Sequence, residues 1–136
     1  MIAALLLGAV LTTTGIWHFA SPHGFESIVP RFLGSPSLWV GLSGTAELAC
    51  AVGLALPRTR RLAGWATAAL FVIVFPANIT MAVHAWQGDG SRWIAFGRLP
   101  LQIPLVLWAV YVARGTLSRG GRRAPAPMPG PRPAPR

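Results

Sequence analysis

Residues 38–56 read LWVGLSGTAELACAVGLAL, an apolar run that carries one acid, Glu47, near its middle. A helix of this length, at about 1.5 Å per residue, extends about 28 Å and can cross the hydrocarbon of a bilayer. An ionisable side chain halfway along such a helix costs about 2.5 kcal/mol or more if it faces lipid. The run therefore predicts a membrane-spanning helix whose acid faces neighbouring helices. Ser43 shares the face of Glu47, and Gly44 allows a neighbour to pack closely.

Two interpretations of Glu47 follow from this position. In the first, it is a protonated, hydrogen-bonded packing residue. In the second, it belongs to a ligand, proton or ion site, which is the usual role of an ionisable group inside a membrane.

The composition agrees with a small membrane protein of one domain. Of the 136 residues, 53% are hydrophobic and 11% are charged, which is unlike a soluble globular domain. Because Cys50 is the single cysteine, an intrachain disulfide, a CxxC redox pair and a multi-cysteine metal site are excluded.

Three further apolar runs complete a predicted four-transmembrane-helix bundle, an all-α integral membrane fold over residues 1–113. The predicted helices are residues 2–19, 38–56, 62–85 and 93–113. The first run has no basic residue before it, so we interpret it as a retained helix rather than a cleaved signal.

Two prolines bear on the later helices. Pro76 removes the partner of the Val72 carbonyl, so the third helix should kink. The fourth helix either begins near Trp93 and contains Arg98, or begins with Pro100 in its first turn. The prolines of residues 20–36 predict a loop, with Phe25, Ile28, Val29 and Phe32 forming a short amphipathic turn on the membrane surface.

The chain carries twelve basic residues, all Arg, against three acids. Residues 114–136 hold six Arg, six Pro and no acid, which predicts a disordered basic tail. The tail has no aromatic residues to stack bases, so we expect it to bind anionic lipid and not nucleic acid. Arg58, Arg60 and Arg61 lie on the same side as the tail in a four-span chain. The positive-inside rule then puts both termini in the cytoplasm of a multi-pass protein of a bacterial plasma membrane.

The strong hydrogen-bonding groups gather in the outer half of this predicted bundle. We expect Arg98 to be the counter-charge of Glu47, directly or through Gln102 or water. His18 and His84 offer an alternative pair that would ligate a haem iron. No catalytic motif and no metal site is predicted. The candidate ligand or proton site consists of Glu47, Arg98, Asn78, Gln102, His18 and Ser43.

Several strings resemble the DoxX family of small four-helix membrane proteins, over about Thr14 to Val110. They are His18-Phe19, Pro22, Phe25, Ile28-Val29-Pro30, Ser43-Gly44 with Glu47, Leu56-Pro57 with Thr59-Arg60, Pro76-Ala77-Asn78-Ile79 with Met81, and Arg98-Leu99-Pro100-Leu101-Gln102. The resemblance implies the same four-helix fold and a link to redox or oxidative-stress systems, since the family name comes from association with a thiosulfate:quinone oxidoreductase. This chain lacks the cysteine pair of redox-active relatives.

Two functions are compatible with these observations. The first is a non-catalytic membrane subunit that holds a quinone-like molecule in an apolar pocket with a few polar groups. Such a subunit would work with a redox partner or as a homo-oligomer. The second is a small proton-coupled carrier that uses Glu47 and the break at Pro76. Four short helices leave little room for two alternating gates, which favours the first.

Overall fold

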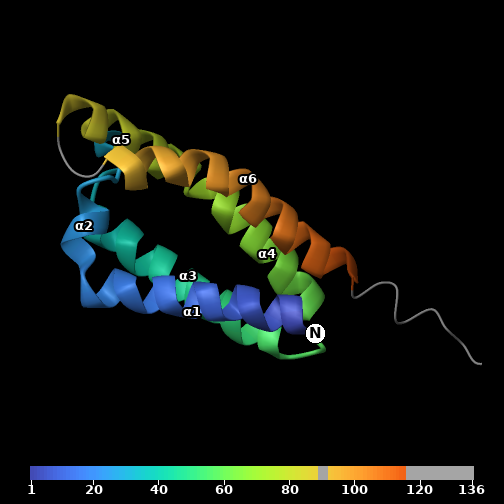
Figure 1. The fold of residues 1–136 in the computed structure, drawn as a ribbon. Coiled ribbons are helices and arrows are strands. Elements are labelled where there is room, and N and C mark those ends of the chain that lie inside the picture. The colour runs from blue at the N-terminus through green and yellow to red at the C-terminus, as the bar shows by residue number, and fades with distance from the viewer. Residues whose placement is uncertain (89–91, 116–136) are drawn as a thin grey trace, which may run out of the picture.

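The computed structural model describes residues 1–88 and 92–115, all as helices and short connections (Figure 1). The helices are α1 (Ile2–Ala20), α2 (Pro22–Glu26), η1 (Arg31–Leu33), α3 (Pro36–Ala55), α4 (Arg60–Ile73), α5 (Phe75–Gln87) and α6 (Arg92–Gly115). The predicted disorder of the tail concerns residues that lie, from position 116 onward, outside this description.

Four segments are long and apolar enough to cross a membrane: α1, α3, α4 together with α5, and α6. This confirms the predicted all-helical fold with four candidate spans. The ends of α1 and α3 differ from the predicted ends by two residues or fewer, within the usual uncertainty of helix boundaries.

The third span is interrupted near Pro76, where the kink is predicted. α4 ends at Ile73 and α5 begins at Phe75, with Val74 between them. Val74 N–H donates to Leu70 O at 3.0 Å, and Asn78 N–H donates to Val74 O at 3.3 Å. Pro76 therefore occupies the first turn of a new helix, where its missing N–H costs little.

The fourth span begins at the earlier of the two predicted positions. α6 begins at Arg92 and contains Arg98, with Pro100 and Pro104 inside the helix. Arg98 is thus a helical residue of the span and not a residue of the preceding boundary.

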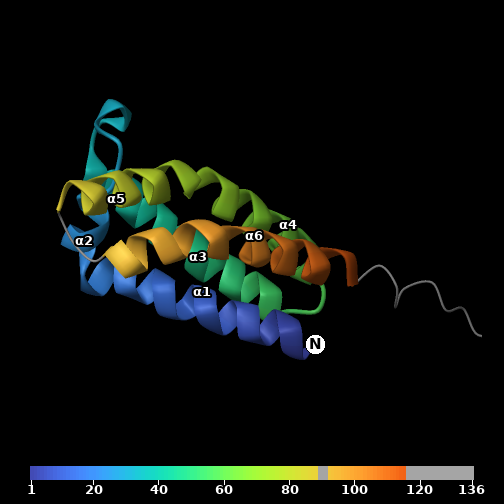
Figure 2. The same cartoon turned by 45° about the horizontal axis from the view of Figure 1, so that its top comes forward.

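The spans form two antiparallel pairs, α1 with α3 and α4–α5 with α6 (Figures 1 and 2). Glycines allow the close approaches within each pair. A Cβ added to Gly44 would lie 2.8 Å from His18 Cβ, and one added to Gly64 would lie 2.9 Å from Ala113 Cβ. The small side chain predicted to matter at Gly44 is therefore required by the α1–α3 crossing.

The two ends of the bundle differ in composition. We call the half that holds the beginning of α1, the end of α3, α4 and the end of α6 the apolar half. Its buried core is Ala4, Leu7, Leu11, Cys50, Ala51, Leu54, Ala63, Ala68, Phe71, Ala109 and Val112. We call the other half, which holds the end of α1, the beginning of α3, α5 and the beginning of α6, the polar half. Here α5 packs mainly against α6.

The segment predicted as a loop with an amphipathic turn contains α2 and η1. α2 packs on α1 and α3 at the end of the polar half (Figure 1). Ile28 is buried, whereas Phe32 is exposed. Trp39 Nε1 donates to Leu33 O at 2.8 Å and fixes η1 on the first turn of α3.

Candidate functional site

Glu47 is the acid of α3, and it faces the neighbouring helix α1. Its side chain is buried, with 8% of the residue exposed. Among the described residues, its Oε2 atom has no hydrogen-bond partner. A buried acceptor without a partner costs about 1–3 kcal/mol, and more if it is charged. Among the described residues, this oxygen is therefore the fully buried side-chain acceptor that lacks a partner.

His18 is the basic residue of α1 that lies beside the Glu47 carboxyl group. Its Nδ1 atom is 3.7 Å from Glu47 Oε2 and 2.8 Å from Thr14 O. Because a carbonyl oxygen accepts and cannot donate, Nδ1 must be the protonated ring nitrogen and donate the hydrogen bond to the Thr14 carbonyl. The 3.7 Å distance to Glu47 is too long for a hydrogen bond, so the two side chains interact only electrostatically.

Local packing holds the His18 ring in this place. The Phe25 ring of α2 stacks on it, with ring centroids 3.9 Å apart and planes 19° apart. On the other side, the close approach of Gly15 and Gly44 draws α1 onto α3. The short helix α2 thus covers the histidine at the end of the polar half.

Arg98 lies on α6 across from this pair and is partly buried. It is within coulombic range of Glu47, as His18 is, and the Thr14 side chain is a hydrogen-bonding neighbour of the same carboxyl group. Its Nη1 atom donates to Met81 Sδ at 3.8 Å, and a thioether is a weak acceptor. Among the described residues, the basic side chain within 4.0 Å of the Glu47 carboxyl group is His18 and not Arg98. The direct form of the predicted Glu47–Arg98 pair is therefore not made.

Asn78 and Gln102 form a second polar group at the break between α4 and α5. Asn78 Nδ2 donates to Gln102 Oε1 at 2.9 Å, and Gln102 Nε2 donates to the Phe71 carbonyl. Gln102 therefore caps a carbonyl at the end of α4 from the neighbouring helix. Pro76 itself frees the carbonyl of Val72, so the bond from Gln102 goes to the carbonyl that precedes it in the same turn.

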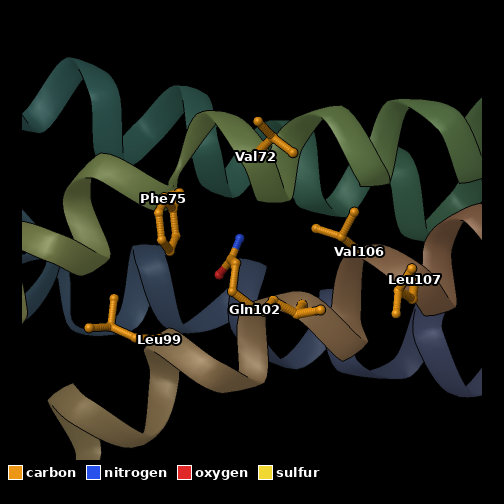
Figure 3. A pocket seen from close by; sticks show the side chains of 7 residues that line it. Val72, Phe75, Leu99, Gln102, Val106 and Leu107 are labelled. Carbon is orange, nitrogen blue, oxygen red and sulfur yellow. The ribbon is translucent and has the colours of Figure 1, made fainter.

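Gln102 also reaches an apolar groove between α4 and α6 (Figure 3). The groove has a volume of about 310 Å³. Its other lining residues are apolar: Val72, Phe75, Leu99, Ile103, Val106 and Leu107. Figure 3 shows the Gln102 amide pointing from α6 towards the end of α4, beside Phe75.

The six predicted site residues are thus divided between two places. Glu47 and His18 meet between α3 and α1, and Asn78 meets Gln102 between α5 and α6. Arg98 connects the two places, since it is one turn before Gln102 on α6 and in coulombic range of Glu47. Ser43 is half-buried one turn before Glu47. His84, the other histidine of the haem alternative, is half-buried on α5.

Four contacts were not predictable from the sequence: Phe25 on His18, Thr14 O on His18, Met81 on Arg98, and Phe71 O on Gln102. Two of them use backbone carbonyls, which carry no residue-specific signal. A third bond to a helix carbonyl comes from the threonine run of α1, where Thr12 Oγ1 donates to Gly8 O at 2.9 Å. Phe25 could be found only by placing α2 over α1.

This arrangement suits binding of a hydrogen-bond donor inside the membrane. The buried oxygen Glu47 Oε2 is available as an acceptor, whereas His18 Nδ1 and the Gln102 amide are engaged. Arg98 uses one N–H donor, on Met81 Sδ. In residues 1–88 and 92–115, no three His, Cys, Asp or Glu side chains gather as a metal site would need.

The sequence was compared with known proteins and families. No curated protein and no solved structure matches it significantly. Residues 7–113, which include all four spans in whole or large part, match the family described as Domain of unknown function (DUF8561), and the chain belongs to this family.

Proposed function

We propose that the protein is a non-catalytic membrane subunit that binds a small, largely apolar molecule through Glu47. The single observation that supports this proposal is the buried Glu47 Oε2 without a partner among the described residues. An intramembrane acid is costly and usually functional, and here the Nδ1 donor of the adjacent His18 is used on the Thr14 carbonyl instead. A ligand that brings an O–H or N–H group would satisfy it.

The ligand class follows from the surroundings of that oxygen. Bilayer-soluble molecules reach such a site through the membrane, so the body of the ligand should be apolar. Its head should donate to a carboxylate and tolerate the stacked His18 and Phe25 rings. A quinone-like molecule fits, because its reduced form carries two aromatic hydroxyl donors. The DoxX resemblance points to the same class and to a redox or stress-related system.

A small proton-coupled carrier is the second candidate. The observation that favours it is the break between α4 and α5, held by a side-chain bond from Gln102. Broken spans are where secondary transporters bind and gate their substrates. In this alternative, Glu47 exchanges a proton, and pH-driven solute uptake into vesicles would be observed.

We also propose that the apolar half faces the cytoplasm of a bacterial cell and that both termini lie there. The support is the Arg58 to Arg61 cluster and the Arg content after position 113. Reporter fusions at Gly88 and at the C-terminus should give opposite sidedness. Equal sidedness would rule out the four-span topology.

Native mass spectrometry of the protein, purified gently from bacterial membranes, tests the binding function. Wild type should retain a small apolar molecule, and Glu47→Gln should lose it. Glu26→Gln, which removes an acid from α2 at the membrane surface, is the matched control and should retain the molecule. Wild type without any bound small molecule, or a Glu47→Gln variant that keeps it, would contradict the proposal.

A further inference from the structure

The end of the apolar half carries exposed arginines and no acid. Arg58 lies in the α3–α4 connection, Arg61 lies at the beginning of α4, and Arg114 lies at the end of α6. We call these three residues the arginine rim. None of the three acids of the chain falls within residues 48–88 or after residue 89. The α3–α4 connection and the end of α6 lie together at this end (Figures 1 and 2).

The helix packing brings part of this rim together. At the α4–α6 crossing, a Cβ on Gly64 would lie 2.9 Å from the Ala113 backbone nitrogen. Arg61 precedes Gly64 by three residues and Arg114 follows Ala113 directly. Because the helices are antiparallel, both arginines start within about one turn, roughly 5 Å, of the same crossing. The backbone positions of Arg61 and Arg114 are therefore near each other at this end of the bundle.

The guanidinium groups of the rim differ from that of Arg60 in their hydrogen bonding. Arg60 caps the end of α3, with Nε donating to Leu54 O at 2.8 Å and Nη2 donating to Ala55 O at 3.1 Å. Among the described residues, the rim guanidiniums make no hydrogen bond and no ion pair. Their donors remain free for an anion.

The surface beside the rim is apolar. Leu62 is 74% exposed and Trp65 is 43% exposed on α4, next to Arg61. Tryptophan is enriched at the level of lipid headgroups, and basic groups between spanning helices on the cytoplasmic side bind anionic headgroups. An acidic protein would match the charge but not the exposed Leu62 and Trp65 below it, whereas a lipid matches both.

We propose that the arginine rim binds the phosphate group of an anionic phospholipid, whose acyl chains lie along Leu62 and Trp65 of α4. The inference is independent of the function proposed for Glu47. It concerns the opposite half of the bundle and a different ligand.

The test uses the full chain in nanodiscs that contain phosphatidylglycerol and phosphatidylcholine in equal amounts. Lipids that remain on the protein after release into detergent are counted by native mass spectrometry. Wild type should retain phosphatidylglycerol in preference to phosphatidylcholine. Each single replacement, Arg58→Gln, Arg61→Gln or Arg114→Gln, should lower that preference about fivefold, from the usual contribution of a basic residue at an anionic membrane surface.

A charge-matched control separates a site from overall charge. The triple variant Arg58→Gln/Arg61→Gln/Arg114→Gln should lose the preference. Arg122→Gln/Arg123→Gln/Arg132→Gln, with the same loss of charge, should lower it much less, because we expect the tail to attract anionic lipid through its overall charge alone. Equal losses in the two triple variants would overturn the proposal, as would equal retention in wild type and the rim variant. Glycerol phosphate in excess should not displace the lipid. Displacement would show that a free phosphate ester suffices and would overturn the lipid assignment.

Discussion

The apolar half and the polar half of this bundle are built from the same four spans but solve different packing problems. In the apolar half, Leu7, Leu11 and Leu54 are fully buried, and the two helix pairs meet there. In the polar half, a short helix, a broken span and a buried acid take the place of such a core. The comparison indicates that the packed core lies in the apolar half, whereas the residues of the proposed binding site lie in the polar half.

Hydrogen bonding sharpens this contrast. The apolar half ties its elements together with satisfied bonds, such as Trp108 Nε1 to Ala3 O at 3.2 Å and Arg60 to the end of α3. In the polar half, Gln102 and Asn78 are satisfied as well, but Glu47 Oε2 is not. A structure selected for stability alone would replace this acid, since an unpaired buried acid weakens the fold.

The largest expected effect is on the core of the apolar half. Leu54→Ala should lower the free energy of unfolding by about 2–4 kcal/mol, because Leu54 is fully buried and a cavity would remain. Thermal unfolding in detergent measures the change. Leu42→Ala, on the exposed face of the same helix, is the control and should cost less than about 0.5 kcal/mol. Equal losses in the two variants would contradict the division into halves.

A smaller loss is expected at the helix break. Gln102→Leu leaves the Phe71 carbonyl and Asn78 without their partner and should cost about 1–2 kcal/mol. Gln87→Leu makes the same change at the exposed end of α5 and should have little effect. If Gln102→Leu is as stable as wild type in the same unfolding assay, the break does not depend on this cap.

The coupling free energy between Glu47 and Arg98 should be smaller than the loss of stability expected for Gln102→Leu. They are in coulombic range without a direct ion pair, so a double-mutant cycle of Glu47→Gln and Arg98→Leu should give about 0.5–1 kcal/mol. Unfolding of the four proteins in one detergent measures it. Strict additivity would remove Arg98 from the site. A coupling above about 2 kcal/mol would instead make the pair a structural element of the polar half.

The smallest effect is expected from the tail. Deleting residues 120–136 removes six prolines and no large apolar side chain except Met128. We predict a change in unfolding free energy below about 0.5 kcal/mol. A large loss of stability would mean that the tail docks on the bundle, and the apolar half would then not be complete at the end of α6.

The sequence predicts the spans well and the site only in part. Hydrophobic length locates the four spans because the bilayer fixes how many apolar residues a helix needs. The position of Gln102 one turn from Arg98 follows from helical spacing. Helical spacing does not predict its partner, the Phe71 carbonyl. Gln102 reaches that carbonyl because α4 ends two residues later, at Ile73. Likewise, helical spacing does not show that His18 Nδ1 donates a hydrogen bond to the Thr14 carbonyl and not to Glu47.

Thermal unfolding with and without a short-chain hydroquinone tests most directly whether Glu47 binds a ligand. At about one hundred times the Kd, the hydroquinone should stabilise wild type by about 2.7 kcal/mol. Glu47→Gln should show almost no shift, whatever its stability without ligand. Equal stabilisation of the two proteins, or no shift in either, would contradict the account of Glu47 as the ligand acceptor of the polar half.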